Sequence, residues 1–337
     1  MKNMKILDDE RFIRHVENLI DPKEVSHLYF YQTFKRLLPR SIFKKLLYKT
    51  SKKTPYMGFV IEPYCLFLFF KLKNIEKAKS LLPERYELKK TRIFADEEPE
   101  LYLGMGVFNT RASTFWGSRL ESYLIAEDKE TGHPSWIFMD ILSNTIIYLP
   151  SIGVADRNSK NAIYTTSSKG DILLDFKDDT TDRHIILTGN ITNGKMRSLD
   201  QPLWIIGNTS VGHIKKFSDN NDDPFAVIFD PAEVEKALEI PTKDLHLKIN
   251  TLFPDLAEPE LCKVLCFPFA QHYIADSPGR RTYIKDTNDM IENYNKIADM
   301  EDIKTFSTRN IKIMLLIGIS LFMVIFISLF ILLIVNL

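Results

Sequence analysis

The segment RLESYLIAE, residues 119–127, places an arginine, a glutamate and a tyrosine at every second position. In a β-strand, alternate side chains share a face, so Arg119, Glu121 and Tyr123 would lie on one face and Leu120, Ser122, Leu124 and Ala126 on the other. If the first face points inward, the buried carboxylate needs a partner, and Arg119 is the nearest one. These side chains would then form a polar spot in an apolar cavity, a usual form of a small-ligand site. If that face points outward, Arg119 and Glu121 form an exposed ion pair that contributes little to stability.

Common cofactor and catalytic signatures are absent from the chain. Gly104-Met105-Gly106 lacks the third glycine of a dinucleotide fingerprint, and there is no GxxxxGK, HExxH or GxSxG sequence. Cys262 and Cys266 are four positions apart, but no second cysteine or histidine pair accompanies them. Two packed thiols are therefore favoured over a zinc site. We predict no cofactor and no metal.

The elements that would position these residues are mainly strands. From residue 58 to about 275, short apolar or alternating runs are separated by clusters of Gly, Pro, Asn and Asp. Helical signals within this region are sparse. They comprise residues 74–83 and residues 230–240, where Asp230 and Glu233 have the spacing of a capping box. We therefore predict an α+β fold whose main domain is a mainly antiparallel, barrel-like β-structure that hides its strand edges.

Four stretches of this region resemble a known family. They are FFKLKNIEKAKSLLPERYEL, LYLGMGVFNT, GSRLESYLIAEDKETG and MDILSNTIIYLPSIGVADRNSKNAIY. In order they comprise a strand, a short helix that ends in Leu-Leu-Pro, paired strands, a strand with a glutamate, a Thr-Gly turn and a later lysine. This pattern resembles the acetoacetate decarboxylase-like superfamily over roughly residues 58–275.

The resemblance implies a β-rich, barrel-like core whose cavity holds a lysine that forms a Schiff base with a β-keto acid. Carried over, Glu121 matches the strand glutamate, and Lys160 is the nearest match to the catalytic lysine. The family motif contains a proline and two adjacent lysines, whereas this chain has Asn158-Ser159-Lys160-Asn161. The second cation, which activates the nucleophile in acetoacetate decarboxylase itself, is missing. The polar string RNSKN is also typical of an exposed loop, which makes Lys160 alternatively a surface lysine.

The run that ends the sequence is apolar enough for a membrane. No charge occurs in the 23 residues from Ile313 to Val335. At about 1.5 Å per residue, a helix of this length covers roughly 34 Å, which is enough to span a bilayer. Its polar breaks, Gly318, Ser320 and Ser328, do not form the polar stripe of a buried core helix. We predict a transmembrane helix within residues 311–337.

The residues around this run predict its orientation. Lys304, Arg309 and Lys312 precede it, and cationic residues close to a span stay in the cytoplasm. The beginning of the sequence lacks the pattern of a secretory signal, and only two residues follow the run. We therefore expect a tail-anchored, single-pass membrane protein with most of its chain in the cytoplasm.

The remaining segments complete a four-part organisation. Residues 1–57 read as helical, and Asp21, Pro22 and Glu24 are spaced as at a capped helix start. Within this part, residues 35–53 are basic and amphipathic, and would either lie on an anionic membrane surface or form a solvated helix docked on the domain. Residues 58–283 form the β-rich domain, residues 284–310 a polar juxtamembrane stalk, and residues 311–337 the anchor.

Charge and composition narrow the choice of partners. The chain has 44 basic and 44 acidic residues, which excludes the strong positive field of a typical nucleic-acid binder. We expect membrane lipid and a small organic acid or an apolar, lipid-derived ligand as partners. Assembly into a homo-oligomer is a further alternative. Three functions compete: a membrane-held ligand-binding domain, a Schiff-base decarboxylase or lyase that acts through Lys160, and a membrane-bound scaffold for another protein. An inward pocket with Glu121 favours the first two, a lysine in that pocket selects the enzyme, and a filled interior leaves the scaffold.

Overall fold

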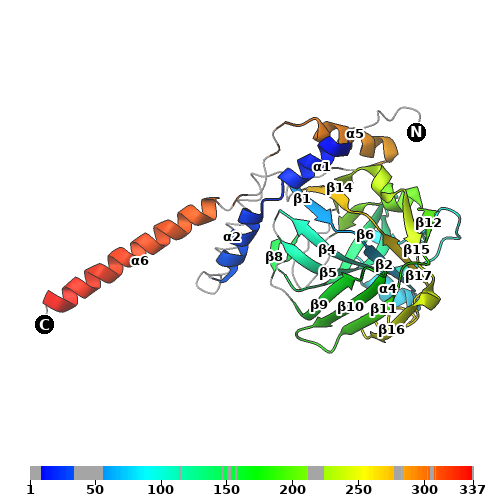
Figure 1. Cartoon of the computed structure of the whole chain (residues 1–337), viewed down its shortest axis with the longest axis horizontal. Coiled ribbons are helices and arrows are strands. Elements are labelled where there is room, and N and C mark those ends of the chain that lie inside the picture. The colour runs from blue at the N-terminus through cyan, green and yellow to red at the C-terminus, as the bar shows by residue number, and fades with distance from the viewer. Residues whose placement is uncertain are drawn as a thin grey trace.

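The structure is a computed structural model that describes residues 9–33, 56–113, 115–145, 147–149, 153–155, 158–211, 224–276, 282, 284–301, 303, 307 and 309–335. It is an α+β fold with mostly strands, helices near the N-terminus and one long apolar helix near the C-terminus (Figure 1). The predicted fold class is thus confirmed at this level. The basic segment 35–53 and Lys304 lie outside the described residues.

The main sheet has the strand order β12-β15-β17-β2-β4-β1-β18-β14-β13-β6-β5-β3. Its strands are β1 Tyr56–Ile61, β2 Cys65–Lys71, β3 Tyr86–Leu88, β4 Tyr102–Ala112, β5 Trp116–Asp128, β6 Pro134–Ser143, β12 Lys195–Ser198, β13 Thr209–Val211, β14 Pro224–Phe229, β15 Lys236–Glu239, β17 Lys263–Phe267 and β18 Gln271–Asp276. A further pairing joins β4 to β5. As a result β4, β1, β18, β14, β13, β6 and β5 form a closed circuit of hydrogen-bonded strands.

A second sheet covers the outside of this circuit. Its order is β16-β11-β10-β9, with β9 Ser159–Thr166, β10 Asp171–Asp178, β11 His184–Asn190 and β16 Leu245–Asn250. Leu120 and Leu124 of β5 belong to the same buried cluster as Leu174 of β10 and Leu187 of β11. The face of β5 that carries Leu120 and Leu124, opposite Glu121, therefore packs against the second sheet. A small pair, β7 Ile147–Leu149 and β8 Gly153–Ala155, completes the described strands.

Helices pack mainly against the outside of the strands. They are α1 Asp9–Asn18, α2 Pro22–Thr33, α4 Ile75–Ser80 and α5 Thr287–Ala298, with short turns η2 Pro202–Ile206, η3 Pro231–Val234 and η4 Thr242–Asp244. Phe12 of α1 and Tyr294 of α5 are buried together with Val60 of β1. Part of the segment expected as a stalk is thus a helix packed on the domain.

Local signals predicted some helices and misled at one position. Asn74 caps α4 by accepting a hydrogen bond from the Lys77 amide at 3.0 Å. Asp230 likewise caps η3, but η3 ends at Val234 and β15 begins at Lys236, so the prediction of a helix over residues 230–240 was wrong. Pairing of β15 with β12 and β17 overrides the local helical pattern, because it buries Ala237 in the sheet.

The apolar run forms one helix, α6 Arg309–Val335, which extends away from the strands in Figure 1. Its stretch Leu316–Val335 has a mean hydropathy of 3.0, and none of it is buried against the rest of the chain. The helix is long and apolar enough to cross a membrane, as the sequence predicted by length and composition.

Candidate ligand-binding cavity

A cavity lies inside the closed circuit of strands, because every strand of the circuit contributes to its wall. The space in it that is open to the centre of a water molecule has a volume of about 120 Å³. Roughly 10–15 Å³ of such space holds one water molecule, so the cavity has room for a small organic molecule. The described lining residues of the circuit are Met57, Phe59, Ile61, Phe108, Thr110, Arg119, Glu121, Tyr123, Trp136, Phe138, Ser210, Val227, Gln271, Tyr273 and Ala275.

One end of the cavity is aromatic. Phe67 of β2 meets Trp204 of η2 edge-on at 5.0 Å between ring centroids, and Trp136 lies 5.4 Å from Trp204. Tyr123 meets Trp136 edge-on at 5.3 Å. Edge-to-face contacts of this kind are favourable beyond the apolar area that they bury. This end of the cavity suits the apolar part of a ligand.

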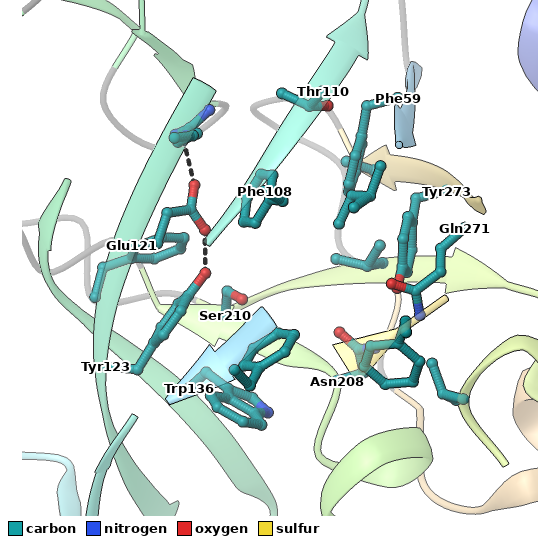
Figure 2. A pocket seen from close by; sticks show the side chains of 18 of the residues that line it. Phe59, Phe108, Thr110, Glu121, Tyr123, Trp136, Asn208, Ser210, Gln271 and Tyr273 are labelled. Carbon is teal, nitrogen blue, oxygen red and sulfur yellow. Dashed lines mark hydrogen bonds and ion pairs between the residues drawn. The ribbon is translucent and has the colours of Figure 1, made fainter. Parts of the chain in front are cut away.

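The polar spot comes from alternate residues of β5, as the sequence pattern predicts for a strand. Arg119, Glu121 and Tyr123 are 3%, 6% and 8% exposed and all line the cavity. Arg119 forms an ion pair with one carboxylate oxygen of Glu121, and the hydroxyl of Tyr123 donates a hydrogen bond to the other. Figure 2 shows the contact between Tyr123 and Glu121 as a dashed line. Of the two orientations open from the sequence, the structure has the inward one.

Burial fixes the role of the tyrosine in this group. It raises the pKa of Tyr123 well above its ordinary value of 10, and the nearby charge of Glu121 raises it further. Tyr123 therefore keeps its proton at neutral pH and acts as a hydrogen-bond donor.

Two glycines of β4 make space across from the polar spot. Gly106 pairs with Glu121 and Gly104 with Tyr123. A Cβ atom on Gly106 would lie 3.2 Å from the ring of Phe67, and one on Gly104 would lie 3.2 Å from the ring of Phe69. The Gly-x-Gly sequence, which is too short for a nucleotide motif, therefore lets aromatic rings lie directly against the backbone of β4.

Apart from Nε of Arg119, which forms the ion pair with Glu121, two buried polar atoms in the wall have no hydrogen-bond partner among the described residues. One is Nη2 of Arg119, whose guanidinium also lies over the ring of Phe115 at 4.7 Å. The other is Oε1 of Gln271, whose Nε2 donates to the carbonyl of Glu233 at 3.2 Å. Figure 2 shows Glu121 and Tyr123 on one side of the cavity and Gln271 on the other. Because an unsatisfied buried polar group costs about 1–3 kcal/mol, a ligand that supplies both partners gains binding free energy.

The sequence pattern missed part of this wall. Gln271 and Tyr273 alternate along β18, the same signal that identified β5, but the segment QHYIAD was not among the expected strands. Trp204 lies in the short helical turn η2, whereas the apolar run LWIIGN of residues 203–208 has the pattern expected of a strand, and that expectation was wrong.

Some solved structures are similar to this chain in fold. No family model matches the sequence, and no curated protein matches it. Among solved structures, the acetoacetate decarboxylase of Legionella pneumophila is 12% identical, with 68% of this chain and 87% of that chain covered and a TM-score of 0.42. The enduracididine biosynthesis enzyme MppR, solved with the condensation product of pyruvate and imidazole 4-carboxaldehyde, is 9% identical, with 66% and 87% covered and a TM-score of 0.34. This chain resembles the two proteins in fold.

The similarity to these two structures concerns the fold alone, at low sequence identity and low TM-score. It assigns neither a substrate nor a catalytic residue to this chain. Of the two residues carried over from the family pattern, Glu121 lies in the cavity, whereas Lys160 is exposed on β9 of the second sheet. No lysine occurs among the described residues that line the cavity.

Proposed function

We propose that this protein binds a small organic acid with an apolar body in the cavity, and that α6 holds it at a membrane. The observation that carries the proposal is the buried guanidinium of Arg119, whose Nη2 has no described partner at the edge of an aromatic cavity. A guanidinium is the side chain best suited to bind a carboxylate, and the aromatic end accommodates the rest of the molecule. The closed circuit of strands acts in this proposal as a barrel-like wall around the ligand.

The charges in the cavity constrain how an acid binds. Arg119 and Glu121 already balance each other, so a bound carboxylate would leave one uncompensated negative charge in a buried space. Burying such a charge is costly, and the group takes up a proton instead. The proposed acid therefore enters together with one proton, and its apparent affinity falls as the pH rises above the pKa of the free acid.

The empty space and the composition of its wall favour binding over the two alternatives. A scaffold that used only its outer surface would not need an interior with two unpartnered polar atoms. A Schiff-base decarboxylase needs a lysine at the substrate, and the described lining has none.

Binding of 3-phenylpropionate to the full-length protein in detergent micelles tests the proposal. The matched control ligand is 3-phenylpropionamide, which has the same shape without the acidic group. We expect the acid to bind at least tenfold more tightly near pH 6, measured by titration calorimetry. Calorimetry in buffers of different ionisation enthalpy should report uptake of about one proton.

The double variant Arg119→Met/Glu121→Gln removes both charges together, which keeps the cavity neutral and its volume similar. Replacing a buried ion pair as a unit is often neutral for stability. This variant should therefore remain folded and lose the preference for the acid. Equal binding of acid and amide by the wild type, or an unchanged preference in the double variant, contradicts the proposal.

The membrane part of the proposal rests on α6. Arg309 and Lys312 precede its apolar stretch, and this position favours a single-pass arrangement with the strand domain on the cytoplasmic side. Deleting residues 311–337 should move the protein from the carbonate-washed membrane fraction to the soluble fraction. Retention of the shortened protein in the membrane would argue against α6 as the anchor.

A further inference from the structure

One end of the closed circuit, called the rim here, is formed by Tyr56, Ala112, Trp116 and Asp276. Tyr56 pairs with Asp276, Ala112 with Phe59, and Trp116 with Arg111, so the first residues of β1 and β5 and the last residues of β4 and β18 lie together. The polar spot is near this end, because Arg119 is three residues into β5.

The aromatic part of the cavity is at the other end of the circuit. Trp136 pairs with Ile125, six residues further along β5 than the position where Arg119 pairs with Ser143. Arg119 is therefore near the rim, and the edge-to-face contacts of Tyr123 with Trp136 and of Phe67 with Trp204 lie further from it. The position of Arg119 favours an amphipathic acid that binds with its carboxylate near the rim.

The helix α1 ends on the rim. The Ser113 hydroxyl, directly after β4, donates to the carbonyl of Leu19 at 3.0 Å. Arg111 binds both carboxylate oxygens of Glu17 at 2.8 Å. A Cβ atom on Gly58 would lie only 2.8 Å from Cβ of Leu19, which shows how closely the two backbones approach.

The start of α6 is tied to the same place. Helix α2 begins at Pro22, three residues after Leu19, and Glu24 in its first turn lies 3.7 Å from Nζ of Lys312. Figure 1 shows α2 next to the start of α6. Lys312 precedes Leu316, the first residue of the apolar stretch, by four residues or about 6 Å of helix. A bilayer that contains α6 therefore begins beside the rim.

The rim also carries a residue suited to that position. Trp116 is 37% exposed, and tryptophan is enriched where proteins meet the membrane–water interface. Its amphipathic ring tolerates contact with both lipid and water.

We propose that the rim faces the bilayer entered by α6, and that the cavity takes up a single-chain carboxylic acid directly from this bilayer. This inference rests on the proposed function and names the ligand class and its source. The chain of the acid enters first and moves from lipid to the aromatic end without crossing water. The carboxyl group follows and stops at Arg119, close to the interface where it lay in the membrane.

The position of the rim is testable with full-length protein in nanodiscs. The discs contain phosphatidylcholine with or without bromine on its acyl chains, and bromine quenches tryptophan on contact. We expect brominated lipid to reduce the emission of the wild type, and most of this reduction to disappear in Trp116→Phe. Trp204→Phe is the matched control and should retain the quenching. Equal quenching in wild type and Trp116→Phe overturns the inference.

The direction of entry is tested with dodecanoic acids dissolved in unbrominated nanodiscs. In Trp116→Phe, 12-bromododecanoic acid should quench the remaining tryptophans at least twofold more than 2-bromododecanoic acid, because the chain end reaches Trp136 and Trp204. The difference should vanish in Trp116→Phe combined with Arg119→Met/Glu121→Gln. Stronger quenching by the 2-bromo acid contradicts entry with the chain first.

Failure of this inference and failure of the proposed function give different results. If 3-phenylpropionate binds in detergent but Trp116 is not quenched by brominated lipid, the cavity binds acids and the bilayer is not their source. If neither acid binds under any condition, the proposed function fails and the inference fails with it.

Discussion

Two arginines of this protein, Arg183 and Arg119, differ in what their surroundings leave unpaired. Arg183 forms ion pairs with Asp140 of β6 and with Asp178 of β10, and thus links the two sheets. Arg119 has one carboxylate, on its own strand, and its Nη2 has no described partner. An arginine between two carboxylates of different elements holds the fold together. One that is half satisfied beside an empty cavity is available to a ligand.

The largest effect expected from this comparison concerns affinity. Arg119→Met should weaken binding of 3-phenylpropionate by about 2–5 kcal/mol, at least 30-fold, because the acid loses its charged donor. Arg183→Met should leave the affinity within about twofold in protein that remains folded. Calorimetric titration of both variants at equal folded fraction measures this difference. A similar loss of affinity in the two variants would remove the distinction.

The effects on the free energy of unfolding should be in the opposite order, with the larger effect at Arg183. Arg183→Met leaves two carboxylates without their cation, and we expect it to lower the free energy of unfolding by about 2–3 kcal/mol, less than for a fully buried pair because Arg183 is 27% exposed. The double variant Arg119→Met/Glu121→Gln should change it by less than about 1 kcal/mol. Urea denaturation of the strand domain, followed by circular dichroism, measures both. A larger cost for the double variant would assign the Arg119–Glu121 pair to the fold.

The pH dependence of stability should come from Asp178, one of the two carboxylates that pair with Arg183. Burial opposes ionisation of Asp178, but hydrogen bonds from Thr180 and the pairing with Arg183 outweigh it and lower its pKa to about 2. Because this pKa lies below the unfolded value, ionised Asp178 stabilises the fold above about pH 4, and this contribution is lost as the pH falls through about 2. Wild type should lose about 2 kcal/mol more than Asp178→Asn between pH 5 and pH 2.

This difference is measured by denaturation at each pH. Asp140, whose pKa burial raises, has the opposite sign, but it is present in both proteins, and the charge of Asp178 is the smallest cause of its shift, so its contribution largely cancels. Parallel pH profiles of wild type and Asp178→Asn would show that Asp178 does not carry the effect.

Tyr123→Phe sharpens the description of the cavity side. It removes the hydroxyl that donates to Glu121 and leaves the ring packing against Trp136 in place. We expect a loss of about 1.5 kcal/mol in the free energy of unfolding, since a hydrogen bond to a charged group is lost. The matched variant Tyr164→Phe removes a buried hydroxyl outside the cavity. Only Tyr123→Phe should also change the affinity for 3-phenylpropionate. Equal affinities of Tyr123→Phe and Tyr164→Phe would show that the Tyr123 hydroxyl does not take part in binding.

The smallest effect is expected at Lys160. This side chain is exposed on β9, so Lys160→Ala should change stability by less than about 0.5 kcal/mol and leave acid binding intact. Acetoacetate followed by borohydride should give no covalent adduct with the wild type, as measured by intact mass. An adduct mapped to Lys160 and lost in Lys160→Ala would instead favour the Schiff-base enzyme.

Much of the local structure was predictable because its signals are local. Asn74 before a short helix, Pro22 at the start of α2 and the alternation in β5 each depend on neighbouring residues. The prediction over residues 230–240 was wrong because its outcome depends on two distant strands that pair with β15. Gln271 was missed although it alternates with Tyr273 along β18, and its place across the cavity from the polar spot comes only from the closure of the circuit.

The sequence by itself determined that Arg119, Glu121 and Tyr123 share a face, and that residues 316–335 form a helix suited to lipid. Both follow from fixed backbone periods and from a continuous apolar run. Only the tertiary structure decided which face of β5 turns inward. Both faces are buried, and apolar Leu120 and Leu124 would be the natural choice for a single core. The second sheet covers those leucines instead, and closure of the circuit leaves the polar face lining the cavity.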